Sequence, residues 1–139
     1  MSHSIPARHL RIKRAYEEPA PDDGRRVLID RLWPRGIKKE KLALDAWAKE
    51  LAPSTELRKW FDHEPSRWDA FRQRYAAELA ARPEALQTLD ELRQHARKDV
   101  LTLIYSARDE VHNGAITLRD FLLHPELLPS PSSTTGDPP

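Results

Sequence analysis

The sequence predicts an α/β fold, a small three-layer sandwich with a short, mostly parallel sheet of about three strands and about five helices. Two apolar runs favour it, RVLIDRL at residues 26–32 and VLTLIYSA at residues 100–107. Continuous aliphatic runs are typical of strands covered on both faces, as in a parallel sheet with helices on each side. The long segment between the two runs has helical spacing, which suits a crossover to a parallel neighbour.

The first strand is expected at residues 10–16, LRIKRAY, where Leu10 and Ile12 stand among charged side chains. Such a strand is expected to be half exposed. The connection that follows, EEPAPDDGR, is too rich in Pro, Asp and Gly to form a helix. It leaves two alternatives open, because a short connection can close a hairpin or cross over to a parallel strand.

Helices are expected from apolar residues that recur at helical spacing and from capping residues. Pro53 ends the first helix, Ser54 and Ser66 cap the second and third, Pro83 stands in the first turn of the fourth, and Asn113 caps the last. The expected inward faces, helix by helix, are Leu44, Trp47, Ala48 and Leu51; Leu57, Trp60 and Phe61; Trp68, Phe71, Tyr75 and Leu79; Leu86, Leu89, Arg93 and Ala96; and Ala115, Leu118, Phe121 and Leu122.

Length and composition indicate one globular domain, expected at residues 9–124. Residues 1–8 are expected to be flexible, and residues 125–139 to form a disordered tail rich in Pro, Ser and Thr. With 39% hydrophobic and 32% charged residues the domain itself is not of the disordered class. The formal net charge of +1 gives no global argument for nucleic acid, so only a local basic patch could support that function.

The chain contains no cysteine, which excludes disulfides, thiolate catalysis and metal ligation by cysteine. No apolar run has the length of a membrane span, and the beginning MSHSIPARHL lacks the apolar segment of a signal peptide. The expected location is therefore the cytoplasm, with no membrane partner.

Polar side chains follow each expected strand, and in open parallel sheets ligands bind outside the carboxyl ends of the strands. Three arginines, Arg31, Arg35 and Arg108, are expected to meet there with Trp33. Guanidinium groups suit bidentate contacts with carboxylate or phosphate, and the N-terminus of the last helix favours anions. The sequence therefore predicts an anionic ligand. The alternative is that the arginines pair with Asp30 and Asp109 and only tie loops together.

His112 and Asp30 are the candidate catalytic residues. An imidazole beside carboxylates can transfer protons near neutral pH. His112 can equally bond a backbone group at the start of the last helix, and Asp30, if it is buried, needs a partner such as Arg108 or Arg35. Both alternatives stay open for each residue.

Ser106 and Asn113 are expected at the same rim as ligand contacts. Ser106 stands between a strand and a helix, but its neighbours Tyr105 and Ala107 do not give the G-x-S-x-G spacing of a nucleophile elbow. No metal or other cofactor is expected, because H-E-x-x-H is absent and His63, His95 and His124 are scattered.

Aromatic and basic residues alternate in RKWFDHEPSRWDAFRQRY, residues 58–75. Such a segment could stack bases and contact phosphates, yet its aromatic residues also fit the spacing of a helix core. His63 and Arg67, at the break between two helices, could reach the rim. The basic cluster RGIKKEKL at residues 35–42 is interrupted by Glu40 and suits the start of a solvated helix.

Three long motifs, D-R-L-W-P-R-G, W-F-x-H-x-P-x-R-W and S-A-R-D-x-x-H-N, resemble the YeaO-like family of small bacterial proteins, a domain of unknown function. The resemblance covers roughly residues 9–124. It implies an α/β fold and a cytoplasmic bacterial protein, and it implies no activity. A departure from the family pattern is Ser106, where Ala is frequent. The pattern matches Asp30, Arg31, Trp33, Pro34, Arg35, His63, Arg67, Arg108, His112 and Asn113.

Three functions compete on the sequence alone. The leading hypothesis is a domain that binds a small anionic or nucleotide-like ligand at the arginine-rich rim, with or without proton transfer by His112 or Asp30. The second is a nucleic-acid-associated module that uses residues 35–41 and 58–75. The third is an adaptor that binds a protein partner through an exposed Trp33. The sequence does not give the ligand, the reaction or the oligomeric state.

Overall fold

The computed structural model describes residues 5–109 and 111–129 of the 139-residue chain. Within them four strands form one sheet in the order β1-β4-β2-β3, and all neighbouring strands are parallel. The strands are β1 (Leu10–Arg14), β2 (Arg25–Leu28), β3 (Ala46–Trp47) and β4 (Leu101–Tyr105). The α/β class and the parallel sheet are confirmed, with one strand more than expected.

The last strand in the sequence, β4, lies between β1 and β2. The connection from β1 to β2 therefore crosses over and does not close a hairpin. It runs through a 3-10 turn at Pro21–Asp23 and ends at Gly24, whose φ is 63°. A Cβ at Gly24 would lie 2.2 Å from the carbonyl oxygen of Val100, so this close approach to the start of β4 requires glycine.

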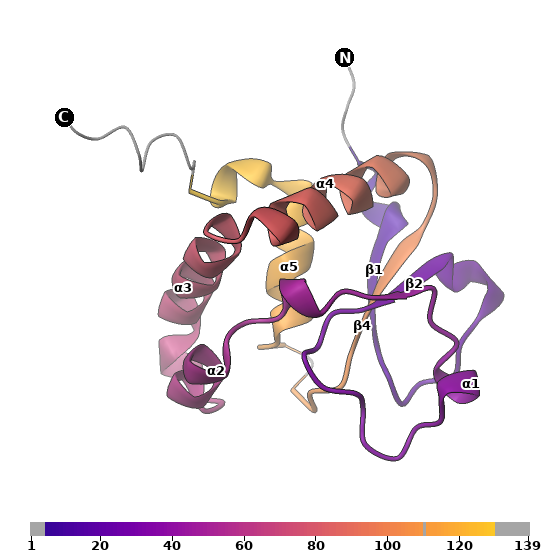
Figure 1. Ribbon diagram of the computed structural model, residues 1–139, viewed down its shortest axis with the longest axis horizontal. Helices are drawn as coiled ribbons and strands as arrows, with labels where there is room; N and C mark the ends of the chain where they lie inside the picture. Colours follow the sequence, from indigo (N-terminus) through magenta and orange to yellow (C-terminus); the bar gives the residue numbers. More distant parts are fainter. Residues whose placement is uncertain (1–4, 110, 130–139) are drawn as a thin grey trace.

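In the described part of the chain five α-helices accompany the sheet: α1 (Lys39–Leu42), α2 (Thr55–Phe61), α3 (Trp68–Ala80), α4 (Pro83–Lys98) and α5 (Gly114–Leu123). Figure 1 shows α3, α4 and α5 on one side of the sheet and the single turn of α1 on the other. None of the helices in the described part of the chain is long and apolar enough to cross a membrane. Of the two ends that the sequence predicts to be flexible, residues 1–4 and 130–139 lie outside the described residues.

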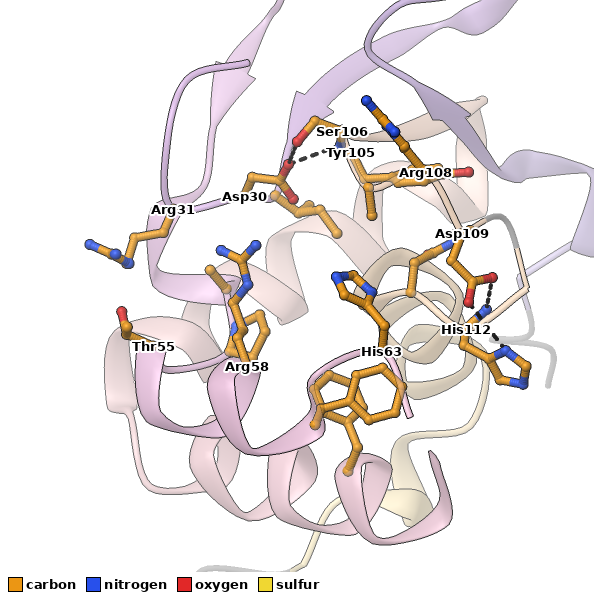
Figure 2. Close-up of a pocket in the computed structure, with 18 of the residues that line it drawn as sticks. Asp30, Arg31, Thr55, Arg58, His63, Tyr105, Ser106, Arg108, Asp109 and His112 are labelled. Carbon is orange, nitrogen blue, oxygen red and sulfur yellow. Dashed lines mark hydrogen bonds and ion pairs between the residues drawn. The ribbon is translucent and has the colours of Figure 1, made fainter. Parts of the chain in front are cut away.

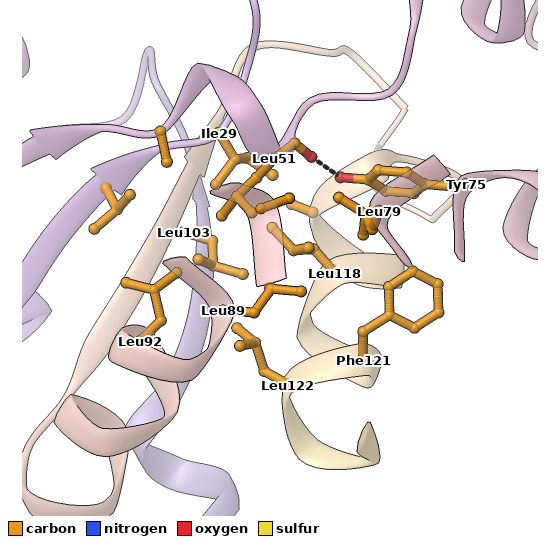
Figure 3. Close-up of a cluster of buried hydrophobic side chains, with 14 of the residues drawn as sticks. Ile29, Leu51, Tyr75, Leu79, Leu89, Leu92, Leu103, Leu118, Phe121 and Leu122 are labelled. Atoms are coloured by element: carbon orange, nitrogen blue, oxygen red, sulfur yellow. Dashed lines mark hydrogen bonds between the residues drawn. The ribbon is translucent and has the colours of Figure 1, made fainter. Parts of the chain in front are cut away.

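The two faces of the sheet are covered unequally. On the thick side, Leu103 of β4 packs among Leu89, Leu118 and Leu122 of the long helices (Figure 3). On the thin side, a smaller buried cluster is covered only by the loop after β2, by α1 and by the segment that leads into β3; its buried members are Ala15, Leu28, Leu42 and Ile104. The result is a sandwich with one full helical layer and one thin layer of loop.

The first expected helix, whose inward face was Leu44, Trp47, Ala48 and Leu51 in the segment KEKLALDAWAKEL, is wrong beyond its first turn, Lys39–Leu42. Ala43 adopts a left-handed conformation, φ 51°, and ends α1. The Asp45 backbone N–H then donates to the carbonyl of Arg26 at 2.8 Å, and its carboxylate accepts from the Arg26 N–H at 2.9 Å. These bonds align the segment as β3 beside β2. The apolar spacing misled because Leu44 and Trp47 pack on the thin side, whereas Ala48 and Leu51 belong to the thick side.

The helix caps are confirmed in part. The Ser54 hydroxyl accepts a hydrogen bond from the Leu57 N–H at 3.0 Å and caps α2, as expected. Ser66 does not cap α3, because it lies inside a 3-10 turn, Pro65–Arg67, and the N-cap position falls to Arg67. The prediction failed because this 3-10 turn precedes the helix and moves its start beyond Ser66.

A buried ion pair holds the thin layer on the sheet. Arg26 of β2 donates to the Asp23 carboxylate at 2.6 Å, and Lys13 of β1 donates to its other oxygen at 2.9 Å. Arg26 also donates to the carbonyls of Leu42 and Ala43 at the end of α1. Burial alone would raise the pKa of Asp23, but the hydrogen bonds from the Ala20 N–H, Lys13 and Arg26 outweigh it and hold that pKa below its ordinary value.

We expect Asp23→Ala to lower the free energy of unfolding by about 3 to 5 kcal/mol, because it leaves the Arg26 charge buried without a partner. The matched control is Asp22→Ala, whose side chain is exposed and forms only a surface pair with Arg11, so about 1 kcal/mol or less is expected. Urea unfolding measures both. Equal losses for the two variants would contradict a structural role of the Asp23 pair.

Candidate functional site

A pocket of about 850 Å³ opens at the carboxyl ends of β2 and β4. Its walls come from residues 29–31 after β2, from residues 105–109 and 112–114 between β4 and α5, and from the α2 region between residues 52 and 63, with Phe71 of α3. Figure 2 shows the pocket between the strand ends and α2. The pocket therefore lies at the sheet edge where open parallel α/β proteins bind ligands.

Asp30 and Ser106 join the ends of β2 and β4 at the pocket. One carboxylate oxygen of Asp30, Oδ2, accepts the Ser106 backbone N–H at 2.9 Å and the Ser106 hydroxyl at 2.7 Å. Burial raises the pKa of Asp30, and the bonds from Ser106 and the charge of Arg58 oppose this only in part. Figure 2 shows the second oxygen of Asp30 directed towards the cavity.

Four cationic side chains line the pocket: Arg31 after β2, Arg58 and Lys59 on α2, and Arg108 after β4. All four are exposed, and within residues 5–109 and 111–129 none of them forms an ion pair. In Figure 2 the Arg58 guanidinium points up from α2 towards Asp30, whereas the side chains of Arg31 and Arg108 extend outward on either side of Asp30. Among these arginines, Arg58 therefore faces Asp30 across the pocket, and Arg31 and Arg108 lie at its margin.

Two of the three arginines expected at the rim, Arg31 and Arg108, line the pocket, and Arg35 does not. Arg35 is exposed on the loop after β2, where its carbonyl accepts from the Tyr16 hydroxyl at 3.1 Å. Trp33 also lies outside the pocket: its indole N–H donates to the Ile37 carbonyl, and its ring packs edge-on against Trp47. This loop folds down onto the thin side of the sheet.

Arg58 and Lys59 were missed by the sequence reasoning. A signal was present, because Arg58 stands three residues before Phe61 and therefore on the same helical face, and both line the pocket. Arg67, by contrast, lies outside the pocket: it donates to the Trp60 carbonyl and sits over the Trp60 ring.

His63 reaches the pocket through an unusual backbone. Asp62 and His63 are consecutive residues with positive φ, 48° and 54°. Such a conformation costs about 1 kcal/mol or more for a residue other than glycine. It turns the chain sharply at the end of α2, and Figure 2 shows the imidazole of His63 directed into the cavity.

His112 is held away from Asp30. Its backbone N–H and that of Val111 donate to the Asp109 carboxylate, at 2.9 and 2.8 Å, and these bonds hold the pKa of Asp109 below its ordinary value. The His112 ring lies 3.4 Å from Asp109 and edge-on to Trp68. Figure 2 places it beyond Asp109, on the side remote from Asp30. Both candidate proton-transfer residues thus line the same pocket, but the His112 ring contacts Asp109 and Trp68 and not Asp30.

Asn113 is the N-cap of α5, as expected from the sequence. Its side-chain oxygen accepts from the Ile116 N–H at 3.0 Å, and its amide donates to the Asp109 carbonyl at 2.9 Å. Asn113 is buried and also lines the pocket. Among the described residues no group of three or more His, Asp or Glu side chains could hold a metal ion.

Fold and pocket together define a small parallel α/β protein with an open, cation-lined pocket at the carboxyl edge of its sheet. The chain belongs to the family described as the inactive DUF488-N3 subclade, whose model matches residues 9–134.

Its relatives include the uncharacterized protein YeaO of Escherichia coli (strain K12), 47% identical over 114 residues, which are 82% of this chain and 96% of that protein. The uncharacterized protein Rv3073c of Mycobacterium tuberculosis (strain ATCC 25618 / H37Rv) is 41% identical over 113 residues, 81% of this chain and 92% of that protein. The expected YeaO-like family is thus confirmed. No solved structure matches the chain.

The raised pKa of Asp30 predicts a pH dependence of stability. The folded protein holds the Asp30 proton more tightly than the unfolded chain, so this stabilisation is full below the ordinary value of 3.8 and is lost as the pH rises through the folded pKa. Wild type should therefore lose stability relative to Asp30→Asn as the pH rises from about 4 through the folded pKa of Asp30. Urea unfolding across this range measures the difference.

Asp69→Asn, which removes an exposed carboxylate on α3, is the control for the loss of one negative charge. A difference between wild type and Asp30→Asn that stays constant with pH, or that changes in the opposite direction, would contradict the burial of Asp30.

Proposed function

We propose that the protein binds a small anionic ligand in the pocket between β2, β4 and α2, and that it binds without catalysing a reaction. The observation that carries the proposal is the set of four cationic side chains, Arg31, Arg58, Lys59 and Arg108, around one opening with no ion-pair partner in the described part of the chain. Guanidinium groups bind carboxylate and phosphate through two parallel hydrogen bonds.

The electrostatics of the walls support an anion. The carboxylate of Asp109 is occupied by two backbone N–H groups, and one oxygen of Asp30 is occupied by Ser106. Gly114, the first residue of α5, lines the pocket, so the positive end of the helix dipole adds to the four side chains. The four cationic side chains outnumber the two carboxylates of the lining, and a cleft with an excess of one sign of charge concentrates ligands of the opposite sign.

Binding without turnover is supported by the surroundings of each candidate catalytic group. His112 contacts Trp68 and Asp109, remote from Asp30. The Ser106 hydroxyl donates a hydrogen bond to Asp30. The residues that flank Ser106 lack the glycines of a strained nucleophile turn. The description of the family as an inactive subclade agrees with this proposal. We also propose that the protein is cytoplasmic, as the sequence analysis predicted.

The two alternatives have less support. A nucleic-acid module would need exposed aromatic rings in residues 58–75, but Phe61, Phe71 and Tyr75 are buried in the core. Residues 35–41 belong to the loop and α1 on the thin side, across the sheet from α2. An adaptor that uses an exposed Trp33 is not favoured, because the Trp33 ring is partly buried against Trp47.

The test is a thermal-shift screen of the full chain with inorganic phosphate, citrate and AMP, because a ligand stabilises the state that binds it by about 2.7 kcal/mol at a hundred times its Kd. We expect at least one anion to raise the Tm, and Arg58→Ala and Arg108→Ala to weaken its binding about tenfold or more, since each removes a charge-assisted hydrogen bond. Arg25→Ala, an exposed arginine at the other end of β2, is the control.

No Tm increase with any of the three probes would overturn the proposal. So would an equal loss of affinity in Arg25→Ala, because the effect would then be one of net charge. If Arg108→Ala unfolds, Arg108 has a structural role. The anion affinity of Arg58→Ala alone would then decide whether the cationic residues of the pocket bind the ligand.

A further inference from the structure

We infer that the anionic ligand is a nucleotide, with its phosphate at the cationic opening and its base at the inner wall, where Asp30 accepts a hydrogen bond from an N–H group of the base. The inference rests on the proposed function. It adds the chemical class of the ligand and a specificity role for Asp30. The argument starts from the difference between the two ends of the pocket.

The inner end is lined by apolar and aromatic side chains. Ile29, Phe61, Phe71 and Tyr105 all line it, and each is buried, with no more than 7% of its surface exposed. A phosphate or citrate ion gains nothing from such a wall, whereas a flat heterocyclic ring gains hydrophobic burial and aromatic contact. The cavity of about 850 Å³ is also within the size range of pockets for whole organic ligands.

Asp30 gives this inner end its polarity. Ser106 occupies Oδ2 with two hydrogen bonds, and Oδ1 accepts none from the described residues and faces the cavity. An anionic group placed here would be repelled by the carboxylate, so a ligand that carries an anion must turn a hydrogen-bond donor towards Asp30. The exocyclic amino group of adenine, cytosine or guanine and the ring N–H of guanine or uracil are such donors.

Arg58 lies between the two ends. Its guanidinium points from α2 towards Asp30 in Figure 2, and Arg31 and Arg108 extend outward on either side of Asp30 at the margin of the pocket. A ligand that spans the pocket can therefore direct a hydrogen-bond donor to the Asp30 carboxylate beside the apolar wall and an anionic group to Arg58 and the arginines at the margin. A nucleoside monophosphate has these groups in this order. The same unit occurs free or at the 5′-phosphorylated end of a strand.

The experiment is isothermal titration calorimetry of the full chain with AMP, purine riboside 5′-monophosphate, ribose 5-phosphate and adenosine. Purine riboside 5′-monophosphate lacks only the amino group, ribose 5-phosphate lacks the base, and adenosine lacks the phosphate. If Asp30 accepts a hydrogen bond from the base, AMP should bind about tenfold or more tightly than purine riboside 5′-monophosphate or ribose 5-phosphate. This is the loss expected for one hydrogen bond to a charged group. GMP, CMP and UMP test the other bases.

Two variants separate the two ends of the pocket. Asp30→Asn should weaken AMP about tenfold and leave ribose 5-phosphate unchanged, because the amide can present a donor where the base also has one. Arg58→Ala should weaken AMP and ribose 5-phosphate alike. If Asp30→Asn does not fold, the comparison of the four ligands with wild type still decides the question.

The outcomes distinguish the two proposals. Equal affinity of wild type for AMP, GMP, CMP, UMP and ribose 5-phosphate would overturn the nucleotide and leave the anion site intact. Equal affinity for AMP and adenosine would instead overturn the anion site. A 5′-phosphorylated tetranucleotide that binds more tightly than AMP supports the inference if Asp30→Asn weakens it, and contradicts it if Asp30→Asn has no effect.

Discussion

The arrangement of the sheet depends on the buried carboxylate of Asp23, because three strands converge on this one residue. Lys13 of β1 and Arg26 of β2 donate to its side chain, and Thr102 of β4 donates to its backbone carbonyl at 2.7 Å. Arg26 extends the network to the carbonyl of Leu42 at the end of α1. A charge this deeply buried is tolerated only with a complete set of partners, so its position fixes the strand order and the thin layer together.

A second carboxylate, Asp30, stands at the opposite end of the β2–β4 pair, and the contrast between the two is informative. Asp23 is buried and is saturated by two cations and a backbone N–H, and its pKa is lowered. Asp30 is half-buried, its carboxylate accepts hydrogen bonds only from Ser106 among the described residues, with Arg58 nearby, and its pKa is raised. One oxygen of Asp30 thus joins the strand ends, whereas the other faces the pocket without a partner among the described residues, and a partly desolvated carboxylate of this kind is typical of functional sites.

The sequence predicted those features that depend on local pattern and on the general rule for parallel sheets. Asp30, Arg31, Ser106 and Arg108 were placed at the pocket because they follow buried strands. β3 could not be predicted, because one apolar spacing, from Leu44 to Leu51, serves two cores on opposite faces of the sheet. The path of the loop after β2, which carries Trp33 and Arg35 to the thin side, depends on contacts with residues that the local sequence does not specify.

The cationic residues of α2, Arg58 and Lys59, were missed for a related reason, since the position of α2 is set by long-range contacts. The Glu78 carboxylate of α3 accepts both the backbone N–H and the hydroxyl of Ser54, the residue that caps α2. This carboxylate fixes the start of α2 and therefore the direction of Arg58. The pocket thus combines α2 and the ends of β2 and β4 with the segment before α5, which carries both Arg108 and His112. Asp109 holds this segment in place, because its carboxylate accepts the His112 N–H at 2.9 Å and its carbonyl accepts the Asn113 amide at 2.9 Å, so one residue fixes the path of the chain that forms this wall.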